Sequence, residues 1–525
     1  MISARLPRVS RRCFPPTVRA SSGLCLCLVL VTGVSIAHAS PGDYDTSFGD
    51  GGIASFPMPN GGVARDVAQL ADGSLLAAGT QGITPLLAKL TSAGRVDTTF
   101  GINGFDSVRR GTKVFQDAML VAAAPANGFT VVELHGNACA GSPFFCAVTS
   151  FKDVFSRRIN GDGSVDTSYG TGGATLIPFS EGSLAISPSG ALAALTMRPQ
   201  LAGPLIFGVA ALRPDGQRDT AFEQLALAAL NCGSPFMPGS SPVGVTRWSG
   251  GKLLVAMGVR ASFSFGSPHT LCISRLNEDG SLDTSFATNG HLIFQTASLV
   301  NHFPFRILVR SDGRILIVML DALPHAIHTP AFVWLTSNGG LDTAFVSGGV
   351  TYPANVLVAS VVDMSLQADD KILIVGYNSA APGAPTLPLD PTLPVLARIQ
   401  ANGAASDATF GYQQSGFRYL TTDTGWLSPQ KALASAGGGI FVLGTSVAST
   451  PTPGDPFLGG DFAIAKLHDM ADLGNGGGGG GGGCAMIQGV RNGTIDPTLP
   501  LLLMLALLWA RFPNARRRSL RVGTT

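Results

Sequence analysis

Glutamate is almost absent from this chain. Only four of its 525 residues are glutamates, and charged residues of all kinds make up 13%. Glycine, by contrast, accounts for 67 residues. Strong helix formers are therefore scarce and turn formers abundant, which argues against helical bundles and coiled coils. The composition favours a β-protein rich in turns.

The sequence also lacks the short motifs of common catalytic sites. It contains no Gly-x-Ser-x-Gly, no phosphate-binding loop and no dinucleotide fingerprint. With so few glutamates, a glycosidase would have to take both its acid and its base from aspartates. No catalytic residue is therefore assigned and no cofactor is predicted. The weak metal-site candidate is Asp321, His325 and His328, in a segment that flanking prolines mark as a loop.

The N-terminus has the pattern of an export signal. Five arginines and no acidic residue occur in residues 1–19, followed by the apolar stretch GLCLCLVLVTGVSIAHA. The stretch ends with small residues at Ala37 and Ala39, as a signal-peptidase site requires. Residues 1–39 are therefore predicted to be a signal peptide, with a retained membrane anchor as the alternative.

The net charge of +2 hides an acidic body. Removing the five signal arginines, and the six arginines and one aspartate after Gly483, leaves 24 basic and 32 acidic residues. A net charge of −8 argues against a nucleic-acid partner. An exported chain can form disulfides. Cys139 and Cys146, which close the loop CAGSPFFC, are the predicted pair, and Cys232–Cys272 is a second possibility.

One Asp-x-x-aromatic element recurs through the body at intervals of 52 to 69 residues. Between its copies lie a short strand and two apolar runs bounded by turns such as Asp-Gly, which favour hairpins. The seven copies are Asp45/Phe48, Asp97/Phe100, Asp166/Tyr169, Asp219/Phe222, Asp283/Phe286, Asp342/Phe345 and Asp407/Phe410.

Repeats of about 60 residues with four short antiparallel strands predict an all-β, seven-bladed β-propeller over residues 40–470. The last repeat lacks an Asp-x-x-aromatic element, and the first element has no apolar run before it. The N-terminal strand is therefore expected to complete the last blade and close the ring, which removes a free sheet edge.

Two interpretations of the repeated aspartate remain open. NEDGSLD (residues 277–283) resembles a calcium loop, because oxygen ligands alternate around a glycine. Other copies, TSAGRVD before Phe100 and ANGAASD before Phe410, lack the earlier acids. A structural role is therefore favoured, in which the aspartate accepts backbone N–H bonds and the aromatic ring is buried between blades. Calcium in one or two repeats is the alternative.

The repeat resembles the delta-60 family of bacterial exported proteins. RLNEDGSLDTSF (residues 275–286) is the nearest copy, and the resemblance covers nearly the whole body. The resemblance implies a propeller-like fold and carries no activity.

The C-terminus separates into a linker and a tail. Residues 471–483 end in eight consecutive glycines and are predicted to be a flexible linker. Residues 484–525 begin with Cys484, contain an apolar segment at 497–512, and end in an arginine cluster. That segment predicts a short transmembrane helix of ~24 Å, with the arginines cytoplasmic.

The tail resembles the JDVT-CTERM type of sorting signal found in Gram-negative bacteria. Cys484 and the run Asp496, Pro497, Thr498, Leu499 and Pro500 match its pattern. The resemblance implies cleavage by a sorting protease in the membrane, modification of Cys484 and transfer to the cell surface. A plain inner-membrane anchor, with the propeller facing the periplasm, is the alternative.

Three functions are consistent with these features. The leading hypothesis is a non-enzymatic surface propeller that binds a glycan or protein. The second is a propeller hydrolase acting on polysaccharide or lactone at the channel mouth, and the third is a structural envelope component without a ligand. Three or more acids or histidines converging at the channel mouth, with a bound ion, would favour the enzyme, whereas a mouth lined by Ser, Thr and apolar residues would favour binding.

Overall fold

The computed structural model describes residues 39–469, apart from 59–60, 83, 107–114, 125–127, 137–152, 178–183, 187–189, 199–205, 231, 233–240, 248, 261–268, 295–301, 322–329, 355, 357, 359, 379–392, 412–413, 424, 436 and 448–459. The chain divides into two units, Met1–Gly474 and Asn475–Thr525, and the second lies outside the described residues. No helix in the described part of the chain is long and apolar enough to span a membrane.

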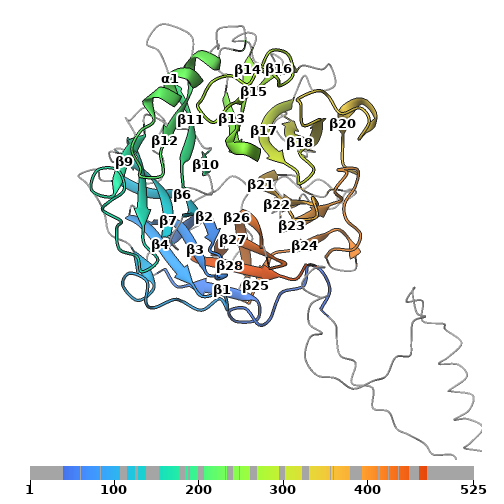
Figure 1. Ribbon diagram of the computed structural model, residues 1–525. Helices are drawn as coiled ribbons and strands as arrows, with labels where there is room; N and C mark the ends of the chain where they lie inside the picture. The colour runs from blue at the N-terminus through green and yellow to red at the C-terminus, as the bar shows by residue number, and fades with distance from the viewer. Residues whose placement is uncertain are drawn as a thin grey trace, which may run out of the picture. The chain divides into compact units, whose positions relative to one another are not determined.

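Seven antiparallel sheets form a ring, as Figure 1 shows. The all-β, seven-bladed propeller predicted from the repeats is therefore confirmed. Blades are numbered here along the chain, and strands are given from the innermost to the outermost. Blade 1 is β2 (Gly62–Gln69), β3 (Leu75–Gln81), β4 (Thr84–Leu90) and β5 (Phe105–Asp106). Blade 2 is β6 (Phe115–Ala124), β7 (Gly128–Gly136), β8 (Asp153–Ile159) and β9 (Ala174–Ile177).

In the described part of the chain, blade 3 has three strands, and the next three blades have four. Blade 3 is β10 (Leu184–Ile186), β11 (Leu192–Arg198) and β12 (Ile206–Leu212). Blade 4 is β13 (Ser241–Arg247), β14 (Leu253–Arg260), β15 (His269–Leu276) and β16 (His291–Phe294). Blade 5 is β17 (His302–Val309), β18 (Ile315–Asp321), β19 (Ala331–Leu335) and β20 (Val350–Thr351). Blade 6 is β21 (Ser360–Leu366), β22 (Ile372–Asn378), β23 (Leu393–Ile399) and β24 (Phe417–Tyr419).

Blade 7 joins the two ends of the propeller. Its strands are β26 (Gly425–Ser435), β27 (Gly439–Val447), β28 (Asp461–Leu467) and the N-terminal β1 (Ile53–Phe56), with the short β25 (Thr421–Thr422) beside β26. β1 and β28 are antiparallel, from Ile53 opposite Ala465 to Phe56 opposite Phe462. The predicted closure of the ring by the N-terminal strand is therefore confirmed.

Among the residues that the structure describes, the hydrophobic core consists of seven separate clusters. Each cluster combines apolar side chains from two neighbouring sheets, and one cluster joins blade 7 to blade 1. Because every sheet lies between two others, its central strands are buried on both faces; all seven residues of β22 are buried. This explains why the apolar runs in the sequence are continuous rather than alternating.

Blade 3 departs from the predicted four strands. In the described residues, helix α1 (Thr220–Ala229) follows its Asp-x-x-aromatic element where other blades have a fourth strand. The sequence after Phe222 contains Glu, Gln, Leu and Ala instead of the usual glycines, and these residues favour a helix. The Asp219 side chain caps the helix by accepting from the Phe222 N–H at 3.1 Å. Two 3₁₀ turns, η1 (Ser249–Gly251) and η3 (Ser347–Gly349), complete the helical elements described.

Candidate functional site

The first strand of most blades, which lies nearest the centre of the ring, contains a bulge. The first strands lie innermost (Figure 1). Six of the seven shift register by one residue against the second strand, and bulges re-aim the side chains that follow them. In four consecutive blades, 5, 6, 7 and 1, the residue after the bulge is charged. We call these residues the central charge cluster: Arg306, Asp363, Lys431 and Asp66.

Asp66 is almost completely buried, at 2% exposure. Its carboxylate accepts from the backbone N–H groups of Val67 and Val121, both at 2.9 Å, and contacts the Lys431 ammonium. Val121 belongs to the first strand of blade 2, whereas Lys431 belongs to blade 7. The Asp66 side chain therefore links three blades, and its hydrogen bonds and ion pair offset the cost of burying its charge.

Asp363 in blade 6 has contacts of the same kind as Asp66: a cation from one neighbouring blade and a backbone N–H group from the other. Arg306 in blade 5 approaches its carboxylate to 2.5 Å, and the Ala432 N–H in blade 7 donates to it at 3.2 Å. Burial raises the pKa of Asp363, against the opposing charges of Arg306 and Lys431. Burial alone would lower the pKa of Lys431, but the carboxylates of Asp66 and Asp363 outweigh it and raise that pKa. Two carboxylates and two cations thus alternate and compensate one another.

The repeated aspartates lie in tight turns. Five of the seven accept a backbone N–H from the residue two positions later: Asp45, Asp97, Asp166, Asp283 and Asp407. Asp219 and Asp342 instead accept from the aromatic residue three positions later. The rings of Phe48, Phe100, Tyr169, Phe222, Phe286 and Phe410 are buried, and Phe345 is half-buried.

A basic residue of the third strand is the partner that the sequence analysis missed. In blade 4, Arg275 contacts the Asp283 carboxylate at 2.7 Å and lies 4.8 Å from the Phe286 ring centroid. Burial alone would raise the pKa of Asp283, but Lys252, Ser285 and Arg275 outweigh it and hold that pKa far below its ordinary value. Equivalent ion pairs join Lys89 to Asp97, Arg398 to Asp407 and Lys466 to Asp45. A visible signal existed: a lysine or arginine recurs one residue before the end of the apolar run, as in LLAKL, CISRL and VLARI.

The two faces of the ring carry connections of different lengths. Between first and second strands, all seven connections have three to five residues, such as 310–314. Between second and third strands, they range from two residues (82–83) to sixteen (137–152), with long examples at 379–392 and 448–460. Because adjacent strands run in opposite directions, these two sets leave opposite faces of the ring. The face with the short turns also carries the connections between third and fourth strands, but these have 14 residues in blades 1, 2, 4 and 5 and 17 in blade 6. The opposite face, which the connections between second and third strands leave and which is here called the loop face, therefore carries most of the variation in length.

A buried ionic group lies beside the longest of these connections. Glu133, near the end of β7, is 1% exposed and accepts from Arg157 Nε at 3.2 Å. The Nε2 atom of His135 lies 3.1 Å from the same carboxylate. This group ties β7 to β8 at the point where residues 137–152 leave the sheet. The hydrogen bonds and ion pair explain why these charges are tolerated in the core.

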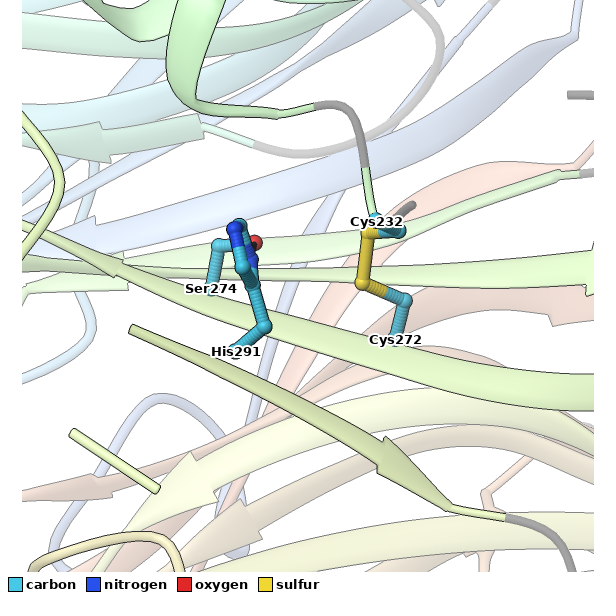
Figure 2. The surroundings of a disulfide bond; sticks show 4 residues. All are labelled: Cys232, Cys272, Ser274 and His291. Atoms are coloured by element: carbon cyan, nitrogen blue, oxygen red, sulfur yellow. Dashed lines mark hydrogen bonds between the residues drawn. A yellow bond between two sulfur atoms is a disulfide. The ribbon is translucent and has the colours of Figure 1, made fainter. Parts of the chain in front are cut away.

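One group in the described part of the chain has the composition of a metal site. Cys232, which follows α1, forms a disulfide with Cys272 in β15. The two sulfur atoms and one ring nitrogen of His291 lie within 4.8 Å of one another. Figure 2 shows His291 beside the disulfide, with Ser274 next to its ring. The second of the two cysteine pairings considered from the sequence is therefore present.

Several predicted site residues lie outside the described residues. They are Ala37 of the cleavage site, the pair Cys139 and Cys146, the histidines His325 and His328, and Cys484 with the run Asp496 to Pro500. Asp321 is described, at the end of β18, where its backbone pairs with His302. In the sequence, Cys139 and Cys146 fall between β7 and β8, and His325 and His328 fall between β18 and β19.

Comparisons with known proteins agree with the fold. A family model described as a domain of unknown function (DUF5122) beta-propeller matches residues 251–286, a range that includes β14 and β15 of blade 4. No curated protein sequence matches the chain.

Several solved structures are similar at low identity. YCF48 bound to D1 peptide is 9% identical, with 81% of this chain and 99% of that chain covered and a TM-score of 0.39. Virginiamycin B lyase from Staphylococcus aureus is 10% identical, with 79% and 98% covered and a TM-score of 0.41. A PL25 ulvan lyase is 8% identical, with 83% and 98% covered and a TM-score of 0.40. Scores this low carry no argument about activity.

Proposed function

We propose that this protein is a non-enzymatic binding scaffold of the cell surface, which holds a glycan or protein ligand on its loop face. The observation that carries the proposal is the difference between the two faces. In this ring, connections of the same kind have nearly constant lengths on one face, whereas on the loop face the connections between second and third strands vary from two to sixteen residues. A rigid ring of this kind has the form of a scaffold that positions binding loops.

The central charge cluster supports binding over hydrolysis. Its two carboxylates, Asp66 and Asp363, each contact a cation and at least one backbone N–H group. A general acid and base pair needs a carboxylate that can exchange a proton with the substrate. Carboxylates engaged in this way are better suited to holding blades 5, 6, 7 and 1 together.

Export and surface sorting belong to the same proposal. The signal peptide would deliver the chain across the inner membrane, and the tail after residue 483 would be cleaved by a membrane protease with Cys484 as the modified residue. The delta-60-like repeats and the sorting-tail pattern support this route. The glycine run would then separate the propeller from the membrane or from its surface attachment.

The binding proposal is tested with the purified full-length chain on an array of polysaccharides. Retained protein and newly released sugar ends are measured in the same wells. We expect retention of at least one polysaccharide without release of sugar ends. Replacing residues 379–392 or 137–152 with Asn-Gly, a two-residue hairpin turn, should reduce retention at least tenfold.

Arg95→Ala is the matched control, because Arg95 is exposed in a turn on the opposite face. It should leave retention unchanged. Release of sugar ends would establish the hydrolase instead. Equal retention by the wild type and both loop variants would contradict a site on the loop face, and no retention by folded protein would contradict a glycan ligand.

The sorting proposal is tested in the native host by fractionation and intact mass. We expect wild-type protein at the cell surface, without the residues after Cys484 and with added mass on that cysteine. Cys484→Ala should accumulate as a full-length chain in the inner membrane. Full-length wild-type protein in the inner membrane, unchanged by the substitution, would reduce the tail to an anchor.

A further inference from the structure

We propose that Cys232, Cys272 and His291 form a zinc site when the disulfide between the two cysteines is reduced. The site lies at the interface between blades 3 and 4, where α1 takes the place of a fourth strand. It is independent of the loop face, and its success or failure does not depend on the binding function proposed above.

The β-sheet of blade 4 places two of the three ligands on one face. Cys272 and Ser274 are two residues apart in β15, so their side chains point to the same side of the sheet. His291, in β16, is directly opposite Ser274 in the register. The side chains of Cys272, Ser274 and His291 therefore all face blade 3. This follows from the alternation of side chains along each strand and from the pairing of the two strands.

The third ligand arrives from blade 3. Cys232 follows α1 and packs in the same hydrophobic cluster as Cys272, between the two blades. The Cα atoms of the two cysteines are 6.3 Å apart. Both cysteines are buried, whereas His291 is half-buried. The histidine is therefore the most exposed of the three proposed ligands.

The dimensions fit a tetrahedral cation. With Zn–S bonds of ~2.3 Å and Zn–N bonds of ~2.0 Å, ligand atoms around zinc lie roughly 3.5 Å apart. The two sulfurs and the ring nitrogen already lie within 4.8 Å of one another, so shifts of about 1–2 Å would bring them to zinc. Two thiolates and an imidazole with water as the fourth ligand form a set suited to zinc.

Ser274 supplies a supporting contact. Its Oγ lies 2.8 Å from Nδ1 of His291, and Ser274 is completely buried. A hydrogen bond to a ligand ring fixes its orientation and tautomer, and losing such a contact lowers metal affinity by roughly 10–100-fold. The structure therefore provides three ligands and a residue that orients one of them.

The change of state is a two-electron reduction. A dithiol reductant attacks one sulfur of the Cys232–Cys272 bond, the S–S bond breaks, and the reductant leaves as its own disulfide. The two electrons remain on the cysteine sulfurs, which are released as thiols. Zinc then binds them as thiolates, and the two thiol protons pass to water. Oxidation would reverse these steps and release the ion.

The test uses the full-length chain, reduced with a phosphine under anaerobic conditions and titrated with Zn²⁺ against a chromophoric chelator. The Cys139→Ser/Cys146→Ser variant serves as background control, because it removes the other cysteine pair of the body. We expect one tightly bound zinc in the reduced control, which the oxidised control lacks. His291→Ala should weaken binding at least tenfold, as should Ser274→Ala. Cobalt in place of zinc should give the visible bands of a tetrahedral thiolate complex.

Circular dichroism separates loss of the site from loss of the fold. His291→Ala keeps the disulfide and should remain folded, so its affinity is informative in either case. If the reduced control unfolds, zinc should restore its spectrum. A reduced control that binds no zinc, or that unfolds and is not restored by it, would overturn the proposal. So would tight zinc binding that persists in Cys232→Ser/Cys272→Ser.

Discussion

Lys431 in the first strand of blade 7 contacts the buried carboxylate of Asp66 in the first strand of blade 1, across the junction where the ring closes. The N-terminal strand β1 closes the same blade at its outer edge. Two interactions therefore close the ring: backbone pairing of β1 with β28 at the outer edge, and the ion pair between Lys431 and Asp66 near the centre. The ion pair depends on two bulges, each of which turns a charged side chain toward the other.

Replacing Lys431 with methionine should destabilise the propeller by about 3 kcal/mol, because it leaves the Asp66 charge buried without its cation. The measurement is the free energy of unfolding in urea. Lys371→Met is the matched control: its partner Asp407 keeps Arg398, at 2.9 Å, so the expected loss is under about 1 kcal/mol. Adding Asp66→Asn to Lys431→Met should recover part of the loss, and an equal loss in Lys371→Met would contradict this account.

Turn glycines make the contacts between neighbouring blades. Gly216 has a φ of +80°, and a Cβ there would lie 2.6 Å from Gly170 N and 2.7 Å from the Tyr169 ring of the preceding blade. Gly172 has a similar φ of +63°, but a Cβ there would have no neighbour within 4 Å. Comparing alanine substitutions at the two positions therefore distinguishes the cost of backbone strain from the cost of steric overlap between blades.

Gly172→Ala should cost about 1–2 kcal/mol, from the left-handed backbone alone. Gly216→Ala should cost at least ~1 kcal/mol more, because the added methyl group also overlaps Tyr169 and Gly170. Urea midpoints of the two variants and the wild type provide the comparison. Equal midpoints for the two variants would show that the blade contact adjusts without cost.

The number of blades was predictable because each repeat contains one Asp-x-x-aromatic turn, and both the aspartate and the aromatic residue of that turn have a structural role. The Asp side chain holds the turn and the aromatic ring fills the space between blades, so the element could be counted in the sequence. The replacement of a strand by α1 was missed, although FEQLALAAL contains helix formers and lacks the glycines of other repeats. The repeat pattern outweighed this local signal.

The central charge cluster could not be predicted from the sequence. Asp66, Arg306, Asp363 and Lys431 come from different repeats, and their convergence depends on the bulge before each of them. A bulge shifts the inward or outward direction of every following side chain by one residue. The Cys232–Cys272 disulfide was named from the sequence only as a second possibility, because its members are 40 residues apart and meet only when blades 3 and 4 pack together.

Asp45 at the ring closure gives the propeller a defined acid sensitivity. Burial alone would raise its pKa, but Lys466, whose Nζ lies 2.8 Å from the carboxylate, and Ser47 outweigh that effect and lower it to about 2. The folded pKa lies below the unfolded value of roughly 3.9. The resulting stability is therefore fully present above about pH 4 and is lost as the pH falls through 2.

Asp45→Asn should therefore cost about 2.5 kcal/mol at pH 6 and roughly half of that at pH 3, measured as the difference in unfolding free energy from the wild type. Asp50→Asn is the control in the same turn region, because Asp50 is 85% exposed and its pair with Arg95 is also exposed. That variant should stay within about 0.5 kcal/mol of the wild type at both pH values. A cost for Asp45→Asn that is the same at pH 6 and pH 3 would mean that the ion pair with Lys466 does not shift the titration of Asp45, and that the variant acts only through the hydrogen bonds of the turn.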